Sequence, residues 1–184
     1  MLTFISLLTA LVTTLGLARQ AESDALRQTA SSYLTAQGAA HHLAAATFAG
    51  ELFSIDPTLL LAIAYRESRF TPGLRGPEVR GKHACGLMQP LMHVQECPEQ
   101  TVFGGYLEGA GHLREWLDTK ECHGDTKCAL LGYSGGYSLL RGCSRGEVLV
   151  ERNGRSVDLC HLIPRATMMR AQRISTITQR GSST

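Results

Sequence analysis

The chain has 184 residues, of which 43% are hydrophobic, so it is long enough for one domain with a hydrophobic core. Its formal net charge is only +2, without a long run of like charge or a basic stripe interleaved with aromatic residues. These features give nucleic-acid binding little support. The sequence contains no internal repeat, which excludes a repeat architecture.

The N-terminus carries an uncharged and mostly aliphatic segment, residues 2–18, which ends at Arg19. Small residues at Gly16 and Ala18 are typical of a signal peptidase site, although no Lys or Arg precedes the segment. We therefore expect a signal peptide or a membrane anchor in residues 1–18. A buried N-terminal helix is the alternative. Residues 19–39 are polar and rich in alanine, and we interpret them as a linker or a loose helix.

The even number of cysteines, six in all, fits an exported protein with up to three disulfides. Cys122 and Cys128 flank a short polar loop, and we expect them to pair. A zinc site is disfavoured because the chain has no C-x-x-C pair.

Apolar periodicity predicts helices over residues 41–52, 57–70, 105–117 and 164–174, and another that starts near Lys127 or Cys128. Residues 73–85, rich in glycine, proline and charge, are predicted to form a loop. Asn153-Gly154 between two apolar runs predicts a β-hairpin. The expected fold is a single, mainly α domain over 40–175, with a small β-hairpin insertion and a polar tail over 176–184.

Glu67 is the strongest candidate for a catalytic residue. On the helix that begins at Asp56-Pro57, it shares one face with Leu60, Ile63 and Ala64, at the end of an apolar stripe. A carboxyl group in a low-dielectric environment tends to hold its proton near neutral pH, which suits a general acid. The alternative is a helix-end glutamate that pairs with Arg66 or Arg69.

Three motifs in order give the chain a family resemblance. Residues 56–70 resemble the catalytic helix of lytic transglycosylases of the soluble, goose-lysozyme-like type, in which an Asp-Pro start is followed by an apolar run and then by Glu-Ser. Gly86-Leu87-Met88-Gln89 is similar to the family's G-L-M-Q segment. Residues 133–136 resemble its A-Y-N-x-G motif, with Ser134 in place of Asn. The resemblance implies an α+β, lysozyme-like fold.

The resemblance also implies a reaction. Glu67 would protonate the glycosidic oxygen between N-acetylmuramic acid and N-acetylglucosamine in peptidoglycan. The same carboxylate would then take a proton from the C6 hydroxyl, which closes a 1,6-anhydro ring without water. No metal or organic cofactor is implied.

By the same resemblance, four further residues are expected to serve the substrate: Ser68, Met88, Gln89 and Tyr133. Ser68 would bond the reacting sugar, Gln89 would bind an N-acetyl group or a hydroxyl, and Met88 would pack under the sugar. Tyr133 would orient Glu67 through its hydroxyl. Each also has an ordinary explanation: a hydroxyl bonded to backbone, a surface amide, a core methionine and a buried tyrosine satisfied elsewhere.

The positions of the acidic residues in the sequence favour a reaction without water. Hydrolytic glycosidases usually use two carboxylates at a defined separation. After Glu67 come Glu78, Glu96 and Glu99, and none of them lies in a segment expected to face Glu67. A hydrolytic lysozyme is the nearest alternative, and a wall-binding protein without turnover is another.

A serine esterase is the least favoured alternative. Residues 132–136 form a literal G-x-S-x-G around Ser134, and Asp158 and His161 follow in the order of a catalytic triad. The motif requires a strand before the serine, and none is predicted there.

The expected location is outside the cytoplasm, in the periplasm, the cell envelope or a phage virion. The expected partner is the glycan strand, and a secretion, conjugation or phage-entry machine is a further possibility. Membrane contact is expected only through the N-terminal segment.

Overall fold

We describe a computed structural model of the chain, which covers residues 36–79, 81–92, 97, 99–146, 148–152 and 155–181. The expected signal peptide or anchor, and the linker before residue 36, lie outside the described residues. No helix in the described ranges is both long and apolar enough to span a membrane.

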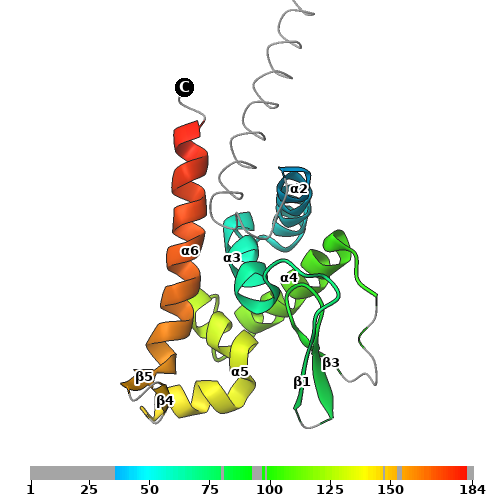
Figure 1. Cartoon of the computed structure of the whole chain (residues 1–184). Coiled ribbons are helices and arrows are strands. Elements are labelled where there is room, and N and C mark those ends of the chain that lie inside the picture. The colour runs from blue at the N-terminus through cyan, green and yellow to red at the C-terminus, as the bar shows by residue number, and fades with distance from the viewer. Residues whose placement is uncertain are drawn as a thin grey trace, which may run out of the picture.

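The fold is mainly helical with small antiparallel sheets, as predicted (Figure 1). The helices are α2 (Ala36–Phe53), α3 (Pro57–Ser68), α4 (Val102–Asp118), α5 (Thr126–Ser144) and α6 (Leu159–Gly181). The strands are β1 (Arg75–Val79), β2 (Lys82–Cys85), β3 (Leu91–Met92), β4 (Leu149–Arg152) and β5 (Arg155–Asp158).

Helix α3 is the centre of the core and packs against α2, α4 and α6 (Figure 1). Its residues 59–64 are all buried. It begins as predicted, because the Asp56 side chain accepts a hydrogen bond from the Thr58 N–H at 2.8 Å and Pro57 takes the first helical position. It ends at Ser68, two residues earlier than predicted, because Arg69 and Phe70 adopt positive φ values of 54° and 65°.

The predicted loop over residues 73–85 is wrong. Strands β1 and β2 form an antiparallel hairpin within that range, and β3 adds a third strand to β2. The range has no alternation of apolar and polar residues, so its strands left no periodic signal. The Cys85–Cys97 disulfide ties the end of β2 to the chain that leads into α4.

The β4–β5 hairpin is confirmed, with Val150 opposite Val157. The Cys143–Cys160 disulfide closes this excursion between α5 and α6. Helix α6 begins five residues before the predicted Pro164 and continues through it. Asp158 explains the early start, because its carboxylate accepts a hydrogen bond from the Cys160 N–H at 2.9 Å.

Two features of the α4–α5 region were tested by the structure. The predicted Cys122–Cys128 disulfide is present and closes the turn between the two helices. Helix α5 starts at Thr126, next to the expected position, and is kinked at Gly136, whose φ is 62°. Its N-terminus is capped by Asp125, which accepts a hydrogen bond from the Cys128 N–H at 2.7 Å.

A buried histidine joins three parts of the core. His42 on α2 is 4% exposed, its Nδ1 lies 3.1 Å from the Tyr106 hydroxyl on α4, and its ring contacts Phe70 after α3. Burial, with a smaller contribution from His41, lowers the pKa of His42 to about 4. The imidazole is therefore neutral in the folded protein at neutral pH.

We predict that His42 makes the protein less stable in mild acid. Between pH 6.5 and about 4 the unfolded chain binds a proton at this site and the folded chain does not, so the free energy of unfolding falls as pH falls. The loss is about 3 kcal/mol over this window. Urea titrations at several pH values should show it, and His42→Gln should flatten this part of the curve. His161→Gln, which removes an exposed imidazole, should not; equal slopes in all three proteins would contradict the prediction.

The α4 glycines provide a second test, of packing. A Cβ on Gly109 would lie 2.5 Å from the Cβ of Met88, whereas a Cβ on Gly111 would have its nearest neighbour, a ring atom of Phe53, at 3.4 Å. Gly109→Ala should therefore lower the free energy of unfolding by about 1–3 kcal/mol, since overpacking displaces neighbours. Gly111→Ala should be neutral or raise it by up to about 1 kcal/mol through helix propensity. Chemical denaturation of the two variants measures both free energies of unfolding. A Gly109→Ala protein as stable as Gly111→Ala would contradict the close contact between Gly109 and Met88.

Candidate functional site

The candidate site lies at the C-terminal end of α3, beside the segment 86–89, α5 and α6. Leu60, Ile63 and Ala64 are fully buried, as the apolar stripe predicts. Glu67 follows one turn later and is the penultimate residue of the helix, with a side chain that is 24% exposed. The carboxylate thus lies at the border between core and solvent and not inside the apolar stripe.

The carboxylate of Glu67 pairs with Arg66, which is the alternative that the sequence left open. Its Oε1 accepts a hydrogen bond from Arg66 Nε at 2.9 Å and a second from a terminal nitrogen of the same guanidinium. That guanidinium also donates to Ser134 Oγ at 2.6 Å and to Thr167 Oγ1 at 3.0 Å. Arg66 is thereby fixed to both α5 and α6.

The two carboxylate oxygens of Glu67 have different hydrogen-bonding environments. Oε1 is held by Arg66, while none of the described residues donates a hydrogen bond to Oε2. A proton carried by this group would therefore lie on Oε2. Sequence reasoning considered Arg66 only as a competing partner and did not identify Thr167, because nothing in the sequence relates residues 66 and 167.

Ser68 joins the end of α3 to the segment 86–89. It is 4% exposed, and its hydroxyl donates to the Leu87 carbonyl at 2.6 Å, with the Ala64 carbonyl also in range at 3.1 Å. The same oxygen accepts a hydrogen bond from the Thr71 N–H at 3.2 Å. In this structure the hydroxyl serves backbone groups, and a contact with a sugar stays a prediction.

Tyr133 on α5 holds the next residue of the same segment. Its hydroxyl donates to the Met88 carbonyl at 2.7 Å, and the Met88 side chain is fully buried against α4. Burial raises the pKa of Tyr133 well above its usual value, and the negative charge of Glu67 raises it further, so the phenol remains a donor. The hydroxyl is thus bonded to the Met88 carbonyl, and none of the hydrogen bonds among the described residues joins it to the Glu67 side chain.

Gln89 adopts a left-handed backbone conformation, with φ of 55°, and its side chain folds back on the hairpin. Nε2 donates to the Leu74 carbonyl at 2.8 Å and to the Gly86 carbonyl at 2.7 Å. Both amide protons are therefore used within the protein. The remaining polar atom of the side chain, Oε1, lies beside Gly76.

A second carboxylate, Glu108 on α4, was not considered from the sequence. It accepts a hydrogen bond from Gln100 Nε2, and Gln100 Oε1 in turn accepts one from the Leu87 N–H at 2.7 Å. Its charge raises the pKa of Tyr133, as that of Glu67 does. Two acidic groups therefore act on the same buried phenol, one from α3 and one from α4.

Two of the acidic residues considered from the sequence as a second carboxylate are exposed. Glu78 lies on β1 with a side chain that is 62% exposed, 3.8 Å from His83, and Glu99 is also exposed. Glu96 lies outside the described residues. None of the contacts of Glu78 and Glu99 in the described residues involves Glu67.

The esterase alternative is contradicted by the position of Ser134. This residue lies inside α5 and donates to the Leu130 carbonyl at 2.8 Å, whereas a nucleophile elbow requires a sharp turn from strand to helix. Asp158 and His161 pair with each other at 3.7 Å near the start of α6, and His161 is 89% exposed. The G-x-S-x-G sequence is therefore a coincidence of helix residues.

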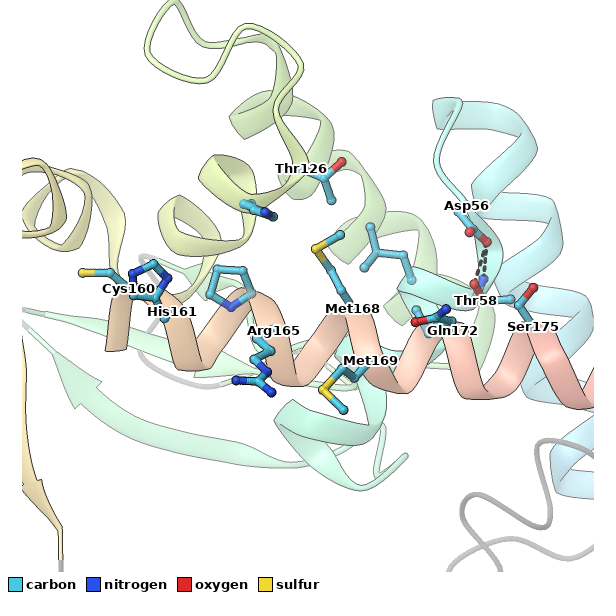
Figure 2. Close-up of a pocket in the computed structure, with 14 residues that line it drawn as sticks. Asp56, Thr58, Thr126, Cys160, His161, Arg165, Met168, Met169, Gln172 and Ser175 are labelled. Atoms are coloured by element: carbon cyan, nitrogen blue, oxygen red, sulfur yellow. Dashed lines mark hydrogen bonds between the residues drawn. The ribbon is translucent and has the colours of Figure 1, made fainter. Parts of the chain in front are cut away.

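A cavity of about 790 Å³ lies elsewhere, between the N-terminal ends of α3 and α5 and one side of α6 (Figure 2). Asp56 and Thr58 line one end of it, and Met168 and Arg165 line its α6 side. Figure 2 shows these side chains around the groove. None of the predicted site residues lines this cavity.

In a comparison with known protein families, residues 45–98 match the family model described as transglycosylase SLT domain. The match contains Glu67, Ser68 and the segment 86–89, but it ends before Tyr133. Comparison with curated proteins and with solved structures finds no match. The family match thus covers the part of the site carried by α3 and the three-stranded sheet.

Removing the Ser68 hydroxyl tests whether it secures the site. Ser68→Ala should lower the free energy of unfolding by about 1–3 kcal/mol, because it leaves the buried Leu87 carbonyl without its donor. Ser144→Ala is the matched control: that hydroxyl bonds the Arg141 carbonyl in an exposed position, and its loss should cost less than about 0.5 kcal/mol. Urea denaturation measures both, and equal losses would show that the Ser68 bond has no special role.

Proposed function

We infer that this chain, whose residues 45–98 match the transglycosylase SLT domain model, is a lytic transglycosylase that cleaves the glycan strands of peptidoglycan without consuming water. The observation that carries the proposal is the position of Glu67 within the matched region. Its carboxylate stands at the end of α3 with one oxygen fixed by Arg66 and the other open, next to the segment held by Ser68 and Tyr133.

The proposed reaction uses Glu67 twice. Oε2 gives a proton to the glycosidic oxygen between N-acetylmuramic acid and N-acetylglucosamine, and the bond breaks toward an oxocarbenium-like centre. The carboxylate then takes the proton of the C6 hydroxyl, whose oxygen bonds to the anomeric carbon and closes the 1,6-anhydro ring. The proton returned to Glu67 resets the site, so no water enters the balance.

Arg66 is proposed as a positioning residue in this reaction. Its guanidinium is anchored to Ser134 and Thr167, so it holds Oε1 at a fixed place while Oε2 exchanges the proton. A bound glycan strand would exclude water from the Glu67 carboxyl group, whose side chain is 24% exposed.

The other predicted site residues support the proposal in different ways. Ser68, Met88 and Tyr133 are buried. The hydroxyls of Ser68 and Tyr133 attach the segment 86–89 to α3 and α5. Gln89 is proposed to contact the substrate through Oε1, because both protons of its Nε2 are already donated to backbone carbonyls. The catalytic unit is proposed to extend over 40–175, and the ordered helices α2 and α6 continue slightly past both limits.

A hydrolytic lysozyme is the second candidate function, and Glu108 is the observation that favours it. A hydrolase needs a second carboxylate to activate water, and Glu108 lies close enough to Tyr133 to act on it. In the structure, the Glu108 carboxylate accepts a hydrogen bond from Gln100. The product distinguishes the two reactions, because an anhydro end is lighter than a hydrolysed end by one water.

Peptidoglycan lies outside the cytoplasm, and three disulfides suit a protein exported there. We propose that the chain acts in the periplasm or the cell envelope. Participation in an envelope-spanning secretion, conjugation or phage-entry machine is part of the same proposal.

The Glu67→Gln variant tests the proposed function on purified sacculi. We expect the wild-type protein to release soluble products with 1,6-anhydro ends, identified by mass spectrometry. Glu67→Gln should fold normally and lose roughly 100- to 10,000-fold in rate, because the amide cannot donate the required proton. Glu78→Gln, which changes an exposed carboxylate on β1, should keep wild-type activity.

The outcomes separate the candidate functions. Activity retained in Glu67→Gln would refute the assignment of the catalytic residue. Reducing ends in place of anhydro ends would make the protein a lysozyme. Binding to sacculi without any release of product by the wild-type protein would leave a wall-binding protein.

A further inference from the structure

Two arginines stack on one tyrosine near the end of α3, and a third lies beside them on α6. The guanidinium carbon of Arg69 lies 4.3 Å from the centre of the Tyr65 ring, and that of Arg170 on α6 lies 4.0 Å from it. Arg173, one turn further along α6, is close enough to act on Arg170. We refer to Arg69, Arg170 and Arg173 as the arginine cluster.

The cluster concentrates positive charge at the end of α3 and on the adjoining part of α6. The pKa of Arg170 is lowered mainly by burial; Tyr65 opposes this effect, and the like charges of Arg69 and Arg173 add to it. None of the carboxylates in the described part of the chain forms an ion pair with these three arginines. Like charges held together in this way attract an anion.

The chemistry of the cluster favours carboxylates. A guanidinium offers planar pairs of N–H donors that match the two oxygens of a carboxylate. Arg69 and Arg173 are exposed and Arg170 is half-buried, so a ligand can reach all three. Stacking on Tyr65 holds two of the guanidinium groups in place and reduces the entropy lost when they bind.

The position of the cluster connects it to Glu67. Arg69 follows Glu67 by two residues at the end of α3. On α6, Thr167 accepts the hydrogen bond from Arg66, and Arg170 lies three residues later, on the same helix face. The cluster therefore lies at the same end of α3 as the carboxylate and against the same helix, α6.

We propose that the arginine cluster binds the carboxylates of the peptide stems that branch from the glycan strand. This proposal rests on the proposed function, because it assumes a peptidoglycan strand at Glu67. The stems leave the strand at the lactyl group of N-acetylmuramic acid, the sugar whose anomeric carbon reacts. Anionic stems therefore project beside the scissile bond, where the cluster stands.

The experiment uses soluble, uncross-linked glycan strands in three forms: with native stems, with stem carboxylates converted to methylamides, and without stems. The third form keeps only the lactyl carboxylate, so it distinguishes that source of charge from the stem. The measured quantity is kcat/KM for the release of anhydro products. We expect the wild-type protein to prefer native stems over methylamidated stems about tenfold or more, mainly through KM, and to lose this preference in high salt.

Variants of the cluster should reduce the preference. Arg69→Gln, Arg170→Gln and Arg173→Gln are each expected to lower the ratio of the two kcat/KM values several-fold. Arg69 and Arg173 are exposed, so their variants keep the test valid if Arg170→Gln loosens the packing on Tyr65. Arg141→Gln removes the same charge from an exposed position near the end of α5 and should leave both the ratio and the activity unchanged.

Each outcome decides one of the two proposals. A wild-type protein that releases no product from any strand overturns the proposed function. A wild-type protein that cleaves all three forms equally well, or cluster variants that keep the full preference for native stems, overturns the arginine cluster while the proposed function stands. Strands without stems that are cleaved as well as native ones, with both better than methylamidated strands, would assign the recognition to the lactyl carboxylate and also overturn the stem proposal.

Discussion

Two hydroxyl groups determine how the site is assembled. Ser68 on α3 donates to the Leu87 carbonyl and Tyr133 on α5 donates to the Met88 carbonyl, so neighbouring carbonyls of one buried segment are satisfied from two helices. Buried carbonyls without donors are costly, which makes this arrangement hard to exchange for another. Glu67 precedes Ser68 in the chain, and its place at the border of the core follows from this attachment.

The charged residues at the end of α3 have different partners. Arg66 holds one oxygen of Glu67 and is itself held by α5 and α6, while Arg69 turns away to stack on Tyr65. Neighbouring arginines thus have separate tasks: one faces the carboxylate and the other faces outward with Arg170.

The three disulfides secure connections, and the helices provide the core. Each bridge joins cysteines separated by 6 to 17 positions, at the sheet that leads into α4, at the α4–α5 turn and around the β4–β5 hairpin. Such short loops restrict the unfolded chain and hold irregular segments that bury little apolar surface. The buried stripe of α3 and the packed residues of α2, α4, α5 and α6 supply the hydrophobic part of the stability.

Signals carried by neighbouring residues determined part of this structure from the sequence alone: the start of α3 at Asp56-Pro57, the Cys122–Cys128 bridge, and the β4–β5 hairpin. Caps, short bridges and hairpin turns depend on residues close in sequence, so a linear pattern contains them. The hairpin at 73–85 had no such pattern and was missed. The partners of the site were decided by tertiary structure, because they join residues 19, 45 and 101 positions apart, as in Ser68–Leu87, Met88–Tyr133 and Arg66–Thr167. The sequence thus placed Glu67 at the end of a helix beside Arg66 and Arg69, and only packing decided that Arg66 pairs with its carboxylate.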